Sequence, residues 1–223
     1  MAAAAFFALW PKFDLRVEHL FYAGSGHFLI HGALANFARR VGIYLPLVVL
    51  VLLLLAGMVR ALGLGWRWAP SVRAMVFLAL TMALGPGLLV NTALKDHAHR
   101  PRPVQVKEFD GKSDFRPFYR FDGACHSNCS FVSGETSAAV WLVAPAMLAP
   151  VAWEPLAIGG ALAFGLMIGL LRMGFGHHFP SDVVFATLLT LFVIRCCHGL
   201  LYGWTPRSEA PSHGALRSTA GSL

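Results

Sequence analysis

Two short stretches of the chain place basic residues, histidine and carboxylates at spacings that suit chemistry on a phosphate group. Residues 95–103 read Lys-Asp-His-Ala-His-Arg-Pro-Arg-Pro, and residues 172–182 read Arg-Met-Gly-Phe-Gly-His-His-Phe-Pro-Ser-Asp. Between them, Ser133 and the residues after it stand where an apolar helix is expected to begin. Cations that converge on such a helix start form a site for a dianionic phosphate. His178, followed four residues later by Asp182, suggests an imidazole whose second nitrogen is held in place.

The composition places this chemistry at a membrane. Hydrophobic residues make up 57% of the chain and charged residues 13%, against about 45–50% and about 25% in soluble globular proteins. The mean hydropathy is +0.61. These values exclude a disordered chain, a coiled coil and an ordinary cytosolic enzyme, and they indicate an integral membrane protein. The net charge is +7, but the chain has no run of five basic residues. We therefore expect no nucleic-acid partner.

Long windows without charge predict the membrane spans, because about 20 apolar residues cross the hydrocarbon core. We predict an all-α, polytopic membrane helix bundle. Its five spanning helices are expected at residues 41–64, 73–94, 134–153, 155–172 and 181–203. Counting the crossings puts the loops 95–133 and 172–181 on the same face of the membrane. The polar residues of both loops therefore share one face of a membrane-embedded domain at residues 41–204.

The two ends of the chain have weaker patterns. Residues 1–40 mix apolar and polar positions. Two interpretations stay open for them: an interfacial segment with a helix around residues 26–40, or a truncated first spanning helix. Residues 205–223 are rich in Ser, Gly, Ala and Pro and have no apolar period, which predicts a disordered tail.

The polar residues together resemble the signature of a known family. The signature consists of Lys95-x6-Arg102-Pro103, Ser133-Gly134 and Arg172-x5-His178-x3-Asp182. In order, spacing and position at helix ends, these motifs resemble the three parts found in the type-2 phosphatidic acid phosphatase superfamily. The resemblance covers about residues 75–200. The stretch from Cys125 to Glu135 is most similar to the bacterial branch that includes lipid A phosphatases.

The resemblance implies hydrolysis of a phosphate ester through a phosphohistidine, without a metal or another cofactor. His178 is then the nucleophile that attacks phosphorus, and Asp182 orients its ring. The groups that bind the phosphate oxygens are then Lys95, Arg102, Arg172, the Ser133 hydroxyl and the Gly134 amide. Phosphoryl transfer depends mainly on positioning and charge stabilisation, which fixed cations and backbone dipoles supply.

One departure from the family pattern concerns the proton for the leaving group. Where the family commonly has Pro-Ser-Gly-His, this chain has Val132-Ser133-Gly134-Glu135, so the histidine that normally acts as general acid is missing. Three interpretations of Glu135 stay open: a general acid in place of the histidine, an ionised partner of the cations, or the mark of a weakened enzyme. The first is slightly favoured, and it requires a carboxyl group that stays protonated near neutral pH.

Other histidines and cysteines raise the questions of a metal and of a disulfide. Four histidines in or beside the loops invite a zinc interpretation: His97, His99, His126 and His177. The chain has no His-Glu-x-x-His motif, and Cys125-x3-Cys129 lacks a second close pair, so we predict no metal site. A local disulfide between Cys125 and Cys129 is expected if their loop faces an oxidising compartment.

These residues predict a membrane enzyme that removes phosphate from a lipid phosphate, with lipid A or a related glycolipid as the favoured substrate. Undecaprenyl pyrophosphate and phosphatidylglycerophosphate are alternative substrates, and a lipid phosphotransferase is an alternative activity. A non-catalytic phospholipid-binding or transport protein is the alternative from a different class. The bilayer and the lipid phosphate are the expected partners, and the oligomeric state stays open.

Charge alone determines the orientation in the membrane poorly, because the loop 95–133 carries seven basic residues against five acidic ones; the cysteines and the resemblance favour polar motifs that face outward. The short connection opposite the polar motifs carries Arg60, Arg67 and Arg73 and contains no acid, which favours the inner side for that connection. The polar motifs are then expected on the periplasmic face of a bacterial inner membrane, as the resemblance also implies.

Overall fold

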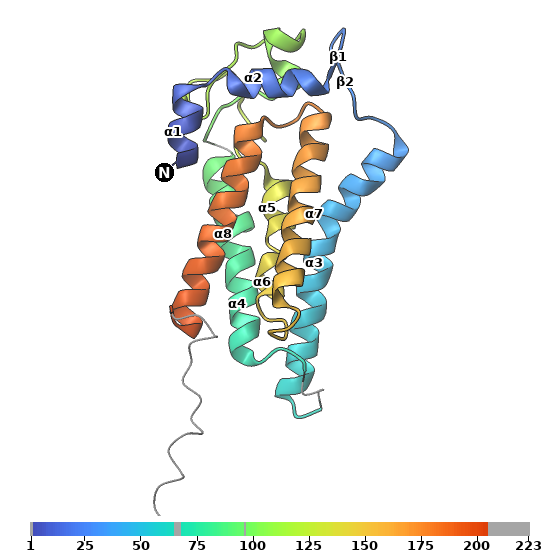
Figure 1. The fold of residues 1–223 in the computed structure, drawn as a ribbon, viewed down its shortest axis with the longest axis vertical. Helices are drawn as coiled ribbons and strands as arrows, with labels where there is room; N and C mark the ends of the chain where they lie inside the picture. The colour runs from blue at the N-terminus through green and yellow to red at the C-terminus, as the bar shows by residue number, and fades with distance from the viewer. Residues whose placement is uncertain (1, 65–67, 96, 205–223) are drawn as a thin grey trace, which may run out of the picture.

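The computed structural model of the chain describes residues 2–64, 68–95 and 97–204. Most of these residues form helices, and the long helices run beside one another along one axis (Figure 1). The predicted helical membrane protein is therefore confirmed in its general form. Arg67 and the predicted tail at residues 205–223 lie outside the described residues.

Among the described residues, four helices are long and apolar enough to cross a membrane. They are α3 (Ala33–Ala61), α4 (Val72–Met82) with its continuation η2 (Ala83–Leu94), α7 (Glu154–Gly174) and α8 (Pro180–Tyr202). In lipid a helix satisfies its backbone groups internally, which is why these apolar segments are helical. The continuation η2 is a π-helix that contains Pro86, which has no backbone N–H to donate.

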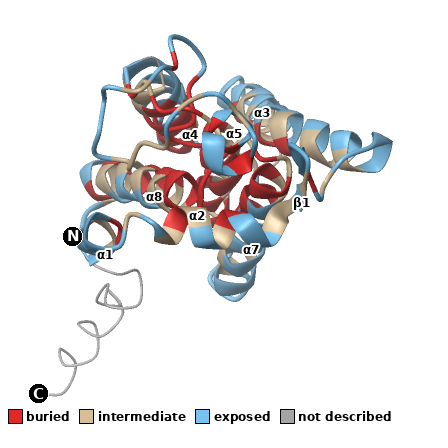
Figure 2. Ribbon diagram, turned by 90° about the horizontal axis from the view of Figure 1, so that it is seen from above, coloured by how far each residue is buried: buried red, intermediate tan, exposed pale blue. Residues whose placement is uncertain are grey.

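The predicted span at residues 134–153 is not one long helix, so the expected number of five spanning helices is not confirmed. The chain forms two short helices instead, α5 (Gly134–Val140) and α6 (Val143–Ala146). The break falls at Trp141, the residue four positions before Pro145, because a proline ring clashes with the carbonyl one turn earlier. Such a break is tolerated at membrane depth only where protein surrounds it. α5 packs against α3, η2, α7 and α8 in the buried centre of the bundle (Figure 2).

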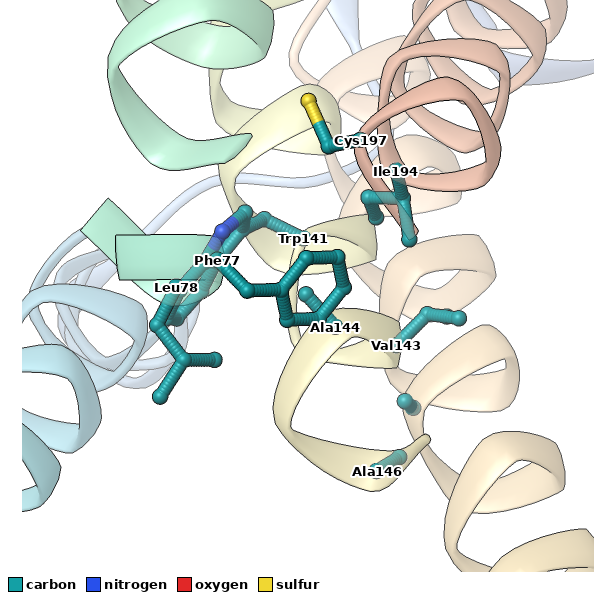
Figure 3. Packing of buried hydrophobic residues seen from close by; sticks show 9 residues of the cluster. Phe77, Leu78, Trp141, Val143, Ala144, Ala146, Ile194 and Cys197 are labelled. Atoms are coloured by element: carbon teal, nitrogen blue, oxygen red, sulfur yellow. The ribbon is translucent and has the colours of Figure 1, made fainter. Parts of the chain in front are cut away.

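The buried core surrounds Trp141. Phe77 and Leu78 of α4 and Ile194 of α8 belong to the same hydrophobic cluster (Figure 3). The indole nitrogen of Trp141 donates to the Thr81 hydroxyl at 2.9 Å, and this hydroxyl donates to the Phe77 carbonyl at 2.8 Å. The polar atoms inside the core therefore have partners, as buried polar groups require. This packing holds the inner end of α5, whose other end enters the polar loops.

The N-terminal residues lie across the end of the bundle that carries the polar loops (Figure 1). They form α1 (Ala2–Leu9), α2 (Phe13–Glu18), the 3-10 turn η1 (His19–Phe21) and a hairpin of β1 (Tyr22–Gly24) and β2 (His27–Phe28). The longest helix in residues 2–32 has 8 residues, which is too short to span a membrane. The helix expected around residues 26–40 begins at Ala33 and is the start of α3.

The loops 95–133 and 172–181 lie at the same end of the bundle, as the predicted crossings require (Figure 1). The first loop contains two one-turn helices, η3 (Pro103–Gln105) and η4 (Lys107–Phe109). The amide of Val104 donates to the carbonyl of Gly176 at 3.0 Å, which joins the two loops directly. The fold therefore brings the separate motifs to one place.

Candidate active site

His178 lies in the connection between α7 and α8 and is 1% exposed. Its Nδ1 is 2.7 Å from the carbonyl oxygen of Ser130. Because a carbonyl only accepts, this contact places the ring proton on Nδ1 and leaves the lone pair on Nε2. Burial lowers the pKa of His178; Asp182 opposes this shift, and Arg172 and Arg102 add to it. The ring is therefore neutral at pH 7, and Nε2 is free to act as a nucleophile.

Asp182 stands in the first turn of α8 and is fully buried. Its Oδ2 accepts hydrogen bonds from the Ser130 hydroxyl and, at 2.8 Å, from the Phe179 amide. The same oxygen is 3.7 Å from Nδ1 of His178, an ion-pair distance that is too long for a hydrogen bond. The carbonyl of Ser130 thus contacts the ring directly, while the carboxylate of Asp182 faces the same nitrogen and holds the Ser130 side chain.

Arg172, in the last turn of α7, brings a buried guanidinium group to the site. Its Nη2 donates to Nδ1 of His177 at 2.7 Å. Burial, with the charge of Arg172 as the next cause, lowers the pKa of His177 to about 3, so His177 stays a neutral acceptor. The Nε and Nη1 atoms of Arg172 are buried and have no hydrogen-bond partner in the described part of the chain. An anionic ligand is the group that such a pair of donors suits.

Ser133 and Gly134 start α5 at this end of the bundle. The hydroxyl of Ser133 caps the helix by accepting from the Thr136 amide, and the Ser133 amide donates to the Asp182 carbonyl at 3.3 Å. A Cβ atom on Gly134 would lie 2.5 Å from Oδ1 of Asn91, so only glycine allows the close approach of η2. The predicted Ser-Gly pair therefore lies against both the loop of His178 and the end of η2.

Glu135 contacts an arginine that the sequence did not single out. Nε and Nη2 of Arg39, from α3, donate to Oε1 of Glu135 at 3.1 and 3.0 Å. Oε2 of Glu135 is 3.2 Å from Nε of Arg39 and 3.5 Å from Nε of Arg172. These are the contacts of a carboxylate between two guanidinium groups, which support the second of the three interpretations of Glu135. The two partners are 96 residues apart, so no local spacing revealed the pair.

Arg100 is the second residue that sequence reasoning missed. It is completely buried, and its Nη1 donates to Oδ1 of Asp182 at 2.5 Å. Its Nη2 donates to Oδ2 of Asp14, from α2, at 2.7 Å. The only signal in the sequence was a third basic residue between Lys95 and Arg102, where the motif assigns no role. The carboxylate next to His178 is thus paired with Arg100.

Lys95 and Arg102 occupy two edges of the site. Lys95 follows η2 and lines a cavity together with Gly134 and Glu135. Nη2 and Nε of Arg102 donate to the carbonyl oxygen of Asn128 at 2.8 and 3.2 Å. Burial lowers the pKa of Arg102. Arg102 also lies within electrostatic reach of the His178 ring, whereas Lys95 faces the cavity.

The cavity beside Glu135 has a volume of about 500 Å³ and lies between α3, η2 and α5. Its polar lining residues are Asn91, Lys95 and Glu135. The other lining residues are apolar or glycine: Ile43, Leu47, Met82, Ala83, Pro86, Gly87, Gly134 and Ala138. Because α3 and η2 belong to predicted spans, the apolar part lies at membrane depth and the polar part lies next to the site.

The other histidines considered for a metal site, and the two cysteines of the first loop, form no metal-binding group in the described part of the chain. Cys125 and Cys129 form a disulfide. Nδ1 of His99 is 2.8 Å from the Cys125 carbonyl, and Nδ1 of His97 is 3.0 Å from a carbonyl one turn earlier. His126 is exposed. Across the described ranges, no three His, Cys, Asp or Glu residues are grouped so that they could hold a metal ion.

Comparison with known proteins gives a consistent result. The sequence pattern of the PAP2 superfamily matches residues 74–206. A lipid A 4'-phosphatase of Francisella tularensis subsp. novicida (strain U112) is 35% identical over 204 residues, which cover 88% of this chain and 90% of that protein. A lipid A 4'-phosphatase of Rhizobium leguminosarum is 32% identical over 207 residues, which cover 86% and 88%.

A third relative, a lipid A 4'-phosphatase of Rhizobium etli, is 39% identical over 112 residues, which cover 50% of this chain and 44% of that protein. No solved structure shows significant similarity to the chain. The family match includes every residue of the three-part signature and extends over more than half of the chain. The chain belongs to the PAP2 superfamily.

Proposed function

We propose that the chain is an integral membrane phosphatase that hydrolyses a lipid phosphate through a phosphohistidine on His178. One observation carries the proposal. Among the described residues, Nη1 and Nε of the buried Arg172 guanidinium make no hydrogen bond, and Nε has only the 3.5 Å ion pair with Glu135, beside a histidine that holds its lone pair on Nε2. A phosphate bound by these donors lies in front of the nucleophile.

The reaction has two steps. In the first, Nε2 of His178 attacks phosphorus, so the N–P bond forms while the ester bond from phosphorus to the lipid oxygen breaks. Nδ1 keeps its proton and donates it in the hydrogen bond to the Ser130 carbonyl. The phosphorylated ring is therefore a cation, and it faces Asp182. In the second step water attacks phosphorus, the N–P bond breaks, and inorganic phosphate leaves.

The charge of the transferred phosphoryl group is stabilised by the residues of the signature. Arg172 supplies Nε and Nη1, which make no hydrogen bond in the described part of the chain, and Arg102 and Lys95 supply further positive charge from two edges of the site. The Ser133 hydroxyl and the Gly134 amide complete the set. Fixed donors of this kind are the main source of catalysis in phosphoryl transfer.

The leaving oxygen takes up a proton as its bond to phosphorus breaks. Two donors come into question: Glu135 as a general acid, and water. The contacts of Glu135 with Arg39 and Arg172 favour a role as an ion-pair partner. We therefore assign the proton to water, and the Glu135→Gln variant distinguishes the two donors.

The cavity beside Glu135 supports a lipid as the substrate. Its apolar lining suits acyl chains, and its polar part, at Lys95 and Asn91, suits a phosphorylated headgroup. Two relatives that cover most of the chain are named lipid A 4'-phosphatase. We therefore propose lipid A, or a related glycolipid phosphomonoester, as the substrate.

We place the active site on the periplasmic face of a bacterial inner membrane. The disulfide between Cys125 and Cys129 lies in the loop next to the site, and such bonds persist in oxidising compartments. Arg60 and Arg73 flank the connection at the opposite end of the bundle, as expected of an inward-facing side.

Phosphate release by the purified protein tests this function. Wild type and His178→Ala are compared on lipid A, undecaprenyl pyrophosphate and phosphatidylglycerophosphate, in buffer with EDTA. We expect wild type to release inorganic phosphate from lipid A fastest, and His178→Ala to lose at least about 10³-fold in rate.

Three other results contradict the proposal in different ways. Equal release by His178→Ala rules out the phosphohistidine, and release that EDTA abolishes indicates metal chemistry. Lipid binding without release of phosphate from any substrate indicates a phospholipid-binding or transport protein. Mass spectrometry of the lipid product identifies the phosphate that was removed and detects transfer to a lipid acceptor.

A further inference from the structure

The short helix α2 brings two buried carboxyl groups to the catalytic end of the bundle. Asp14 is 1% exposed, and Glu18 is not exposed at all. This helix lies outside residues 74–206, the part of the chain that matches the PAP2 superfamily. A buried carboxylate is costly unless it is paired, so the surroundings of each group decide its role.

Asp14 binds the first turn of α8. Its Oδ1 accepts a hydrogen bond from the Ser181 amide at 2.9 Å, and its Oδ2 accepts one from the Ser181 hydroxyl at 2.6 Å. Ser181 immediately precedes Asp182. A side chain 167 residues earlier in the chain therefore fixes the turn that carries the carboxylate facing His178.

Arg100 connects Asp14 to Asp182. One guanidinium nitrogen donates to Asp14 at 2.7 Å, and another donates to Asp182 at 2.5 Å. The third nitrogen donates to the Arg116 carbonyl at 2.8 Å, and the guanidinium carbon lies 4.4 Å from the ring centre of Phe179. One fixed cation is thus shared by two carboxylates.

Glu18 is the other buried carboxyl group of α2 near this cluster. Burial raises the pKa of Glu18 well above its usual value, and Asp182 and Asp14 raise it further. Both oxygens of Glu18 are buried, with no hydrogen-bond partner in the described part of the chain. The surroundings of Glu18 therefore favour its neutral form. Burial also raises the pKa of Asp14, whereas its contacts with Arg100 and Ser181 favour the carboxylate. With both aspartates ionised, the cluster of Asp14, Asp182 and Arg100 carries one net negative charge beside the His178 ring.

We infer that Asp14 is a positioning residue of the phosphatase and acts on His178 through Arg100 and Asp182. The inference rests on the proposed function, in which His178 becomes a cation when it is phosphorylated. Without the charge of Asp14, Arg100 neutralises Asp182 alone, and the negative charge that faces the cationic ring is lost. In a buried site such a loss acts strongly on the charged intermediate.

Asp14→Asn tests the inference, because asparagine keeps the size of the side chain and an acceptor for the Ser181 amide but removes the charge. We expect kcat to fall on the order of 10²-fold, as for small misplacements of catalytic groups, with KM unchanged. The acid limb of the kcat/KM profile should move to lower pH, because loss of a nearby negative charge destabilises the protonated form of His178.

The other groups that face these side chains are the same in the variant. Around the His178 ring they are Asp182, Arg172, Arg102 and His177. Around Asp14 they are Arg100, Ser181, Asp182 and Glu18. A shift of the acid limb therefore reports the charge at position 14.

Glu18→Gln is the matched control. It changes an equally buried residue of the same helix and replaces a carboxyl group, whose neutral form is favoured by burial, with a neutral amide. We expect wild-type kcat and a wild-type pH profile for this variant. Inhibition by vanadate, a phosphate analogue, monitors whether the phosphate site of each variant is folded.

A readout that does not depend on turnover separates this inference from the proposed function. NMR titration of 13C-labelled histidine should show a lower pKa for the His178 ring in Asp14→Asn. Phosphate release by His178→Ala at the wild-type rate contradicts the phosphohistidine function, whatever position 14 does. Wild-type kcat in Asp14→Asn contradicts the positioning role, and so does a lower kcat with unchanged pH profile and ring titration.

If Asp14→Asn does not fold, Ser181→Ala tests the same connection more mildly. This variant removes only the hydroxyl that links Asp14 to Arg100. We expect a smaller fall in kcat at constant KM. An unchanged kcat in a folded Ser181→Ala protein contradicts the positioning role.

Discussion

Arg39 of α3 and Glu135 of α5 form an ion pair at the polar end of the cavity. Arg39 contacts both carboxylate oxygens of Glu135 at 3.0–3.2 Å, and the same carboxylate is 3.5 Å from Nε of Arg172. A fixed anion therefore lies beside the guanidinium group that binds the substrate phosphate in the proposed mechanism. The shorter contacts of Glu135 are those with Arg39. Arg39 therefore limits the competition between Glu135 and the phosphate for Arg172.

This arrangement predicts different effects for the two partners. In Arg39→Gln, Glu135 turns to Arg172 and competes with the phosphate, so KM should rise about tenfold, the size of one charged hydrogen bond. In Glu135→Gln the competitor is gone, so kcat should stay near wild type and KM should not rise. Steady-state kinetics on the lipid substrate measure both.

The double variant Arg39→Gln/Glu135→Gln controls for simple loss of structure, because it should behave like Glu135→Gln alone. Abolished turnover in Glu135→Gln, with Arg39→Gln still active, would identify Glu135 as the general acid and contradict the ion-pair role.

The pH dependence follows from the state of His178. In the proposed mechanism the ring attacks only when it is neutral, and burial lowers its pKa below the usual value of 6.5. The kcat/KM value should therefore hold as the pH falls through 6.5 and decline only at lower pH. His177, with a pKa of about 3, does not titrate in this range. His177→Gln keeps an acceptor for Arg172 and should leave the acid limb of the profile at the wild-type pH. An acid limb above pH 6.5 in the wild-type protein contradicts a lowered pKa of His178.

Gly134 is required by the close approach of η2. In Gly134→Ala the new methyl group meets Oδ1 of Asn91, whose Nδ2 is tied to the Pro86 carbonyl at 2.7 Å. We expect a loss of about 1–3 kcal/mol in unfolding free energy, as for overpacking, and a lower kcat. Thermal unfolding and phosphate release measure the two effects.

Two further variants make this test specific. Adding Asn91→Ala to Gly134→Ala removes the clash and should recover most of the stability. Gly159→Ala, in α7, places a methyl group where no atom lies within 4 Å, so it should not destabilise the protein. Equal losses in Gly134→Ala and Gly159→Ala would show that the clash is not the cause.

The disulfide between Cys125 and Cys129 closes the loop that holds the partner of Arg102, one of the proposed phosphate-binding residues. Asn128, whose carbonyl accepts from Arg102, lies between Cys125 and Cys129 in the closed loop. Reduction by a thiol, or Cys125→Ser/Cys129→Ser, frees this loop and should raise KM several-fold through Arg102. Cys196→Ser/Cys197→Ser, which changes the free cysteines of α8, should leave KM unchanged. Equal KM with and without reductant contradicts the role of the disulfide.

The sequence predicted the parts of the site that depend on local spacing or on counting membrane crossings. His178 and Arg172 follow from short motifs, and the shared face of the two loops follows from the order of the apolar windows. The break between α5 and α6 was not predicted, because an apolar window looks the same whether protein or lipid surrounds it. Only the position of Pro145 carried a signal for it.

The ion pairs Arg39–Glu135 and Arg100–Asp14 could not be predicted from the sequence for a different reason. Arg39 and Glu135 are 96 residues apart, and Arg100 and Asp14 are 86 residues apart. Such pairs form because helices far apart in the chain pack together, and no spacing records that packing.

The contact between α2 and α8 also imposes an order on the making of the protein. Asp14 is synthesised early, but Arg100 and Ser181 follow 86 and 167 residues later. Asp14 therefore lacks these two partners while the ribosome makes the intervening segments, and we expect its contact with α8 to form only after Ser181 has been made. Closure of the buried ion pair is thus a late assembly step, and an unfinished chain at the translocon has no complete active site.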